Sequence, residues 1–175
     1  NIDNLLISGL DNLIVSIDGL TQDNYELYRK GGNIDDILEG LTILINEKRK
    51  RKMIIPYITG QIIVFRHNQH ILEDIKKKLY DIGIDKVKFK SAQIYDYNNK
   101  KEIIPTIAKY SRYYMDDNGI YHIKSELNNK CKRAFSSVVI AANGDVLPCC
   151  FDKSHKYVIG SVKNMKIKDI ISGEN

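Results

Sequence analysis

The sequence lacks any long apolar run. No stretch reaches the roughly 18 residues that a membrane-spanning helix requires. The first residues, NIDNLLISGLDNL, carry acidic side chains and have neither the basic start nor the cleavage site of a signal peptide. We therefore expect no membrane span and a cytoplasmic location. Because the chain does not begin with Met, we interpret it as part of a longer protein.

Cysteine is scarce. The chain of 175 residues has three cysteines, Cys131, Cys149 and Cys150. Three is an odd number and too few for the disulfide framework of a secreted protein of this length. Clustered thiols in a chain without an export signal indicate a metal or redox site more than a covalent crosslink.

A strong charge of one sign is also missing, since 27 basic and 22 acidic residues give a net charge of +5. The most basic run, KRKRK at 48–52, follows an apolar-periodic segment, and cations near a helix C-terminus complement the helix dipole. No aromatic residues interleave with this run, so it does not resemble a base-stacking surface. With 43% hydrophobic residues, the chain can build a core.

Alternating strand and helix patterns fill the first half of the chain. Apolar runs at 10–19 and 54–65 predict buried parallel strands, and the alternation of KVKFKSAQI predicts a third. Thr21 and Asn33 are predicted N-caps of two helices, and Gly83 is the predicted end of another that begins near residue 69. The order strand, helix, strand, helix, strand predicts an α/β fold built on a parallel sheet with right-handed crossovers.

The second half is less regular. Residues 98–130 are predicted to be a connector with one short helix at 107–115. The Asn143-Gly144 dipeptide, between the β-prone runs FSSVVIAA and DVLPCC, predicts a hairpin. A helix near 166–172 completes a small module. We thus expect three parts: 1–97, 98–130 and 131–175.

The hairpin predicts where the cysteines lie. Cys131 and Cys149 would stand at its two feet, and thiolates favour zinc or iron–sulfur clusters. Adjacent residues of a strand point to opposite faces, so Cys149 and Cys150 would not share one metal. Two ligands are too few, unless His122 or His155 contributes. The alternative is that all three cysteines are ordinary buried thiols.

The segment CKRAFSSVVIAANGDVLPCCFD, followed by YVIGSVKNMKIKDI, resembles the start of the SPASM domain of radical S-adenosylmethionine (SAM) enzymes, or of the shorter twitch domain. That family's pattern opens with a Cys, a gap of 9–15 residues, a Gly, four residues and a second Cys. Here twelve residues separate Cys131 from Gly144, and four separate Gly144 from Cys149. Gly160 also matches.

The resemblance extends upstream. LDNLIVSIDG, the strand that ends in FRHNQ, and GIDKVKFK look like the fourth to sixth βα units of a radical SAM partial barrel. It implies that residues 1–97 form the C-terminal half of such a barrel. The CxxxCxxC motif and the glycine-rich second-strand motif of the family are absent, and Ala134-Phe135, Ser161 and Ile171 replace the usual Pro-Trp, Asn and Trp.

The resemblance also implies contacts to SAM at the end of the first strand. Ser16 matches a serine-type position that contacts SAM in relatives, and Asp18 follows it. Ligands bind at strand ends in such barrels.

Two further cofactor-binding candidates lie beyond the strands. Arg29 is a candidate fork donor to a substrate or cofactor carboxylate, and its alternative is a helix-surface arginine. Asn68 follows the second strand, and its alternative is a helix N-cap. His67 and His70 lie close by without a third ligand, and we interpret them as surface histidines.

The metal-site residues that the resemblance implies are Cys131, Cys149 and Cys150. The first two are the expected ligands of an auxiliary 4Fe–4S cluster, whereas Cys150 is expected to pack beside it. The remaining ligands would lie downstream of Asn175. Asp152 stands near the cluster without a role that the sequence predicts.

The implied function is that of a radical SAM enzyme fragment that is inactive alone. The complete enzyme would cleave SAM to a 5′-deoxyadenosyl radical, with electrons from a flavodoxin or ferredoxin, and take hydrogen from a peptide, protein or small molecule. The alternative is a non-catalytic iron–sulfur or zinc module that recruits a peptide or, through the KRKRK run, nucleic acid.

Overall fold

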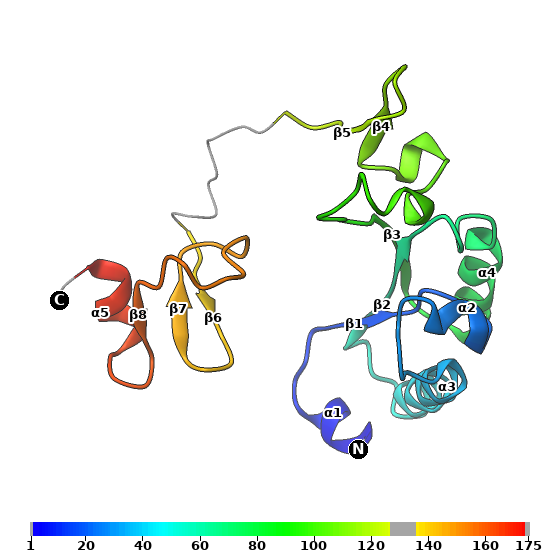
Figure 1. Ribbon diagram of the computed structural model, residues 1–175. Coiled ribbons are helices and arrows are strands. Elements are labelled where there is room, and N and C mark those ends of the chain that lie inside the picture. Colours follow the sequence, from blue (N-terminus) through cyan, green and yellow to red (C-terminus); the bar gives the residue numbers. More distant parts are fainter. Residues whose placement is uncertain (1, 127–135, 174–175) are drawn as a thin grey trace. The chain divides into compact units, whose positions relative to one another are not determined.

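The computed structural model describes residues 2–126 and 136–173, and the chain forms two compact units, residues 1–125 and 126–175 (Figure 1). Most of the segment predicted as a connector therefore belongs to the first unit. No helix in the described ranges is long and apolar enough to cross a membrane.

The first unit is built on a parallel sheet of three strands. These are β1 (Asn12–Ser16), β2 (Tyr57–Val64) and β3 (Lys86–Ser91), with β2 in the centre. Val15 pairs with Gly60, which in turn pairs with Val87. The predicted parallel sheet is confirmed.

Four helices accompany the sheet: α1 (Ile2–Ile7), α2 (Gln22–Glu26), α3 (Ile34–Lys50) and α4 (Leu72–Ile82). Figure 1 shows α2, α3 and α4 on one side of it. The predicted caps are confirmed: Thr21 and Asn33 accept hydrogen bonds from first-turn amides, and Gly83 ends α4 in the left-handed conformation. Such side chains satisfy amides that would otherwise lack a partner.

The basic run at 48–52 finishes α3, as expected. Lys48 is buried and its ammonium lies 3.1 Å from the Asp85 carboxylate. Arg51 pairs with Glu47 and Asp3. Lys48 and Arg51 thus form ion pairs within the first unit at the C-terminal end of α3.

The two faces of the sheet differ. The covered face carries Leu13, Val15 and Ile17 of the first strand region, Ile58, Gly60, Ile62 and Val64 of β2, and Val87 and Phe89 of β3. These side chains pack with α3 and α4 in the core. Alternation places the others on the opposite face, here called the open face: Asn12, Ile14, Ser16, Tyr57, Thr59, Gln61, Ile63, Lys86, Lys88 and Lys90. Ile14 is 58% exposed there.

Residues 92–125 correct one prediction. The expected helix at 107–115 is instead a short 3-10 turn, η2 (Ala108–Tyr110), followed by β4 (Tyr113–Met115). β4 pairs in antiparallel fashion with β5 (Tyr121–Ile123). The Tyr113 ring is buried and its hydroxyl bonds to both backbone groups of Ile94. This tertiary anchor favours the strand over a helix. A second 3-10 turn, η1 (Lys101–Ile103), precedes it.

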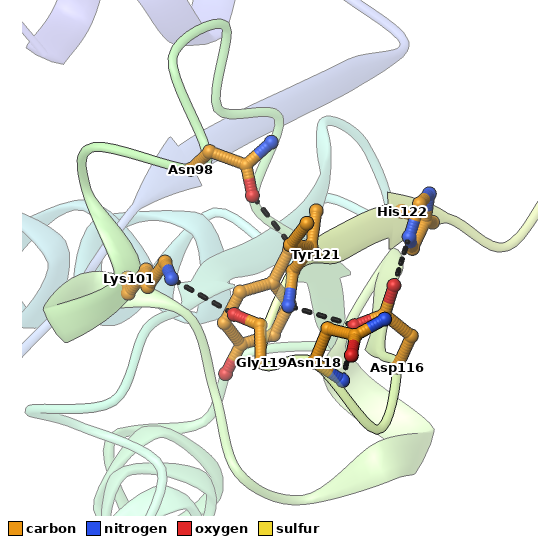
Figure 2. A network of polar contacts seen from close by, with 8 residues as sticks. Asn98, Lys101, Asp116, Asn118, Gly119, Tyr121 and His122 are labelled. Carbon is orange, nitrogen blue, oxygen red and sulfur yellow. Dashed lines mark hydrogen bonds and ion pairs between the residues drawn. The ribbon is translucent and has the colours of Figure 1, made fainter.

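The turn of this hairpin is organised by Asp116 (Figure 2). Its carboxylate accepts hydrogen bonds from the amides of Asn118 and Ile120 and lies 2.9 Å from His122 Nε2. The His122 contact and these amides hold the pKa of Asp116 below its ordinary value. The side-chain oxygen of Asn98 accepts a hydrogen bond from the Tyr121 amide, and this bond connects the hairpin to the preceding loop.

The second unit is a small antiparallel sheet with one helix. β6 (Val139–Ile140), β7 (Asp145–Leu147) and β8 (Gly160–Ser161) follow in order, and α5 (Ile167–Ser172) closes the unit. The closing helix was predicted, whereas β8 adds a third strand to the two of the predicted hairpin. The hairpin is confirmed, but its turn is longer than two residues. The Gly144 amide donates to the Ala141 carbonyl, so Ala142 and Asn143 form the turn centre and Gly144 adopts φ 89°.

Candidate functional site

The strand that was expected to carry the cysteine pair stops short of it. β7 ends at Leu147, and Cys149 and Cys150 lie in a turn where the Asp152 amide donates to the Cys149 carbonyl at 3.1 Å. The strand alternation that was to separate the two side chains therefore does not apply. Cys149 is half-buried, Cys150 is exposed, and both line one open pocket.

Among the described residues, one hydrogen bond reaches the Cys149 sulfur. The Phe151 amide lies 3.4 Å from Sγ and points its N–H at the sulfur. Hydrogen bonds of this kind to cysteine ligands help to set the potential of iron–sulfur clusters. Among the three cysteines, Cys131 lies outside the described residues, so its predicted closeness to Cys149 stays a prediction.

Asp152 has a structural role that the sequence did not reveal. Its two carboxylate oxygens accept the amides of Lys156 (2.9 Å) and Tyr157 (2.7 Å), and they hold the loop that follows the cysteines. Partial desolvation acts to raise the pKa of Asp152, but these amides and the nearby His155 lower it below the ordinary value. The Asp152 carboxylate thus stabilises the loop by accepting hydrogen bonds from its backbone amides.

His155 is the other side chain of this pocket with ligand chemistry. It lines the pocket with Cys149 and Cys150, and its Nδ1 lies 3.6 Å from the Asp145 carboxylate. His122, the other histidine considered, belongs to the first unit and is bonded to Asp116. No three His, Cys, Asp or Glu side chains gather to hold a metal ion within residues 2–126 and 136–173.

A buried polar network lies in the first unit where β1 and β2 end. Asp18 and Asn68 are both fully buried. Asp18 accepts the Ile63 amide at 2.6 Å and the Nε of Arg29 at 2.7 Å. Of the four cofactor-binding candidates Ser16, Asp18, Arg29 and Asn68, the structure bonds Asp18 to both Arg29 and Asn68.

Asn68 uses its whole amide inside the protein. Its Nδ2 donates to the carbonyls of Asp18 and Ile63, and its Oδ1 accepts the Phe65 amide. It is not the N-cap of α4, because that position is Ile71 and has no side-chain cap. Asn68 therefore locks together the two loops that follow β1 and β2.

Arg29 is held by only part of its guanidinium. Nε is bonded to Asp18, and no described residue makes a hydrogen bond to the two terminal nitrogens. The side chain is 32% exposed and its guanidinium lies over the Tyr28 ring, 5.0 Å from the centroid. This arrangement orients a fork that remains able to bind an anion. Ser16 lies apart from it, on the open face.

His67 corrects a second prediction, since it is not a surface histidine. It is half-buried, its ring stacks on Phe65 at 5.4 Å, and its Nε2 is buried without a hydrogen-bond partner among the described residues. Burial lowers its pKa, attraction to Asp18 partly opposes this, and repulsion from His70 adds to it. Asn24 donates a hydrogen bond to the His67 carbonyl and is a further residue of this polar network that the sequence did not indicate.

Comparison with known proteins bears on the second unit. Residues 131–175 match the family model of SPASM, an iron–sulfur cluster-binding domain. The match supports a SPASM domain in these residues and an iron–sulfur role for it, and such domains are typical of radical SAM enzymes. No curated protein and no solved structure matches the chain.

Proposed function

We propose that this chain is part of a radical SAM enzyme and that residues 131–175 supply cysteine ligands to an auxiliary 4Fe–4S cluster. The observation that carries the proposal is the SPASM match to residues 131–175, a range that contains Cys131, Gly144 and Cys149. Thiolates are the ordinary ligands of such clusters. When bound, the cluster would supply electron transfer or a contact for the substrate.

The fit of the residues to a cluster is partial. The donor type is right, and the Cys149 sulfur borders an open pocket and receives the Phe151 amide. The donor number is too small, because the sequence has three cysteines and a 4Fe–4S cluster normally takes four ligands. We propose that Cys131 and Cys149 are ligands and that further cysteines come from outside residues 1–175.

The role of Cys150 follows from its position. It lines the same pocket as Cys149 but is exposed and adjacent in the turn. We assign it to the surroundings of the cluster, while His155 can contact a bound group from the same pocket.

For the first unit we propose binding of SAM at the strand ends. Arg29 would pair with a carboxylate of SAM or substrate through its terminal nitrogens. Asp18 and Asn68 would position it, because their polar atoms are bonded to Arg29 and to the loop backbones. Ser16 would contact SAM from the open face. The radical formed from SAM would take hydrogen from a peptide, protein or small molecule, with a flavodoxin or ferredoxin as the electron donor.

The test is the metal content of the protein with its complete ligand set, purified and reconstituted without oxygen. Cys131→Ala and Cys149→Ala should each lower iron by one cluster, and Cys150→Ala should change it little. Loss of the cluster only in Cys150→Ala would show that the wrong thiol is assigned. Full iron in all three variants, or zinc in place of iron, would refute the auxiliary cluster.

A separate measurement tests the catalytic part. Residues 1–175 contain no CxxxCxxC motif, so this segment alone should form no 5′-deoxyadenosine from SAM under reducing conditions. Product above background would contradict the assignment of the radical-forming cluster to other residues.

A further inference from the structure

β3 is an edge strand whose outer backbone groups are open. The Tyr57 amide donates to the Asp11 carbonyl and the Ile17 amide to the Gln61 carbonyl, so the odd-numbered residues of β2 bond to β1 and the even-numbered ones face β3. Alternate residues of a strand turn their backbone groups to the same neighbour. With the register that pairs Gly60 with Val87, the backbone groups of Lys86, Lys88 and Lys90 therefore bond to β2, whereas Val87 and Phe89 direct their amides and carbonyls outward. In residues 2–126, no strand pairs with them on that side.

The lysines of β3 carry the only charges of the open face. Lys86, Lys88 and Lys90, here called the lysine edge, are all exposed. Their ammonium groups form no ion pair with a carboxylate in the described part of the chain. Side chains two residues apart on a strand are spaced by roughly 6.6 Å. The lysine edge is thus a regular row of positive charge beside unpaired backbone groups.

We propose that the lysine edge binds an acidic peptide in extended conformation, which adds to the sheet as a further strand beside β3. Such a peptide would be complementary to the lysine edge in two ways, through its backbone and through its charges. Its backbone completes the open ladder, as in other strand-addition complexes. Acidic side chains at alternate positions share the spacing of the lysines and pair with them across the strands. The proposal depends neither on the cluster nor on SAM.

Other occupants fit less well. The strands of the open face offer one aromatic side chain, Tyr57 at the start of β2, whose hydroxyl donates to the Asp85 carbonyl. A single ring held in this way is no platform on which successive nucleic-acid bases could stack. A second copy of β3 would place lysines opposite lysines. Tyr110 of η2 does contact β3, but it packs on Phe89, which belongs to the covered face. The competing account is that the lysines protect the edge from pairing.

The binding test uses a fluorescent peptide of about eight residues that alternates glutamate and valine, and fluorescence anisotropy as the readout. A peptide of the same composition with all glutamates in one block is the control for charge alone. We expect the alternating peptide to bind at least ~10-fold more tightly than the blocked one and to weaken as salt is raised. Equal affinity for the two peptides would overturn strand addition, and binding to neither would overturn the proposal entirely.

Variants locate the site. Replacement of all three lysines of the lysine edge by Gln should weaken binding by at least ~10-fold, because cross-strand charge pairs are lost. The matched control replaces Lys76, Lys77 and Lys78 of α4 by Gln, which removes the same charge elsewhere and should change affinity by less than about twofold. If the lysine-edge variant binds the peptide normally and instead aggregates, the lysines protect the edge and the proposal is wrong.

The backbone part has its own readout. The amides of Lys88 and Lys90 already bond to β2 and should not change, whereas bound peptide should slow hydrogen exchange at the outward amides of Val87 and Phe89. Unchanged exchange at these amides, in a complex that forms, would show that the peptide binds without joining the sheet.

Discussion

The two units bury their apolar residues to very different extents. The first unit has a core of buried side chains drawn from its sheet and helices, together with a smaller cluster around Phe65 and Tyr113. Among residues 136–173, only Val146, Leu147 and Ile170 are buried large apolar side chains. Phe151, Tyr157 and Ile171 are each at least 60% exposed. A unit this small is stabilised poorly by its core alone, which suits a domain that depends on a metal group.

The largest expected effect separates the units by metal loss. In the protein with its complete ligand set, chelation of the cluster should speed hydrogen exchange in β7 and α5 by at least ~10-fold, because binding of a structural metal group contributes directly to folding. The amides of β2 should be unaffected. Hydrogen exchange with mass spectrometry gives the measurement. If β7 stays equally protected without metal, the second unit is stable on its own core.

The next effect concerns the buried network of the first unit. Asn68→Ala should lower the free energy of unfolding of this unit by about 3 kcal/mol, because three buried backbone groups lose their partner. Asn46→Ala, at an exposed position of α3, is the matched control and should change it by less than about 0.5 kcal/mol. Denaturant titration measures both. Similar values for the two variants would show that water replaces the Asn68 amide.

A pair of strand glycines tests the two cores by the same change. A Cβ at Gly60 would meet Leu79 Cδ1 at 2.8 Å, and a Cβ at Gly160 would meet Ile170 Cγ1 at 2.9 Å. Each Gly→Ala replacement should cost about 1–3 kcal/mol through overpacking. The first unit should stay folded, whereas the metal-free second unit should lose its exchange protection. Equal tolerance in both units would contradict the difference in core size.

The smallest effect is a pH dependence confined to the first unit. Burial holds the pKa of His67 below its ordinary value of 6.5, so the unfolded chain binds a proton more readily than the folded one. Stability should therefore fall as pH decreases through about 6.5 and level off below the folded pKa. His67→Gln should flatten this slope in denaturant titrations from pH 5 to 8. His70→Gln removes only a weak repulsion, and an equally large change in that variant would count against the burial of His67 as the cause.

Local patterns predicted the first unit well because its elements agree with their own residues. Thr21, Asn33 and Gly83 each stand at a helix end, and the apolar runs around Ile14 and Ile62 became neighbouring parallel strands. Capping and periodicity operate within a few residues, so they can be recognised without a partner. The prediction was wrong at 107–115. The conformation there is decided by the buried Tyr113 ring, whose hydroxyl bonds to Ile94, a residue distant in the sequence.

The candidate sites show the same division between what local sequence patterns predict and what tertiary contacts decide. The sequence by itself determined the cysteine spacing, the hairpin and the positions of Asp18 and Asn68 after two strands, because these depend on short-range order. Only the tertiary structure decided how these side chains are used. It bonded Asn68 to two loops, buried Nε2 of His67, ended β7 before Cys149 and left the outer amides of β3 without a partner strand in the described residues. Burial and hydrogen-bond pairing depend on which distant segments meet, and a single stretch of sequence does not contain that information.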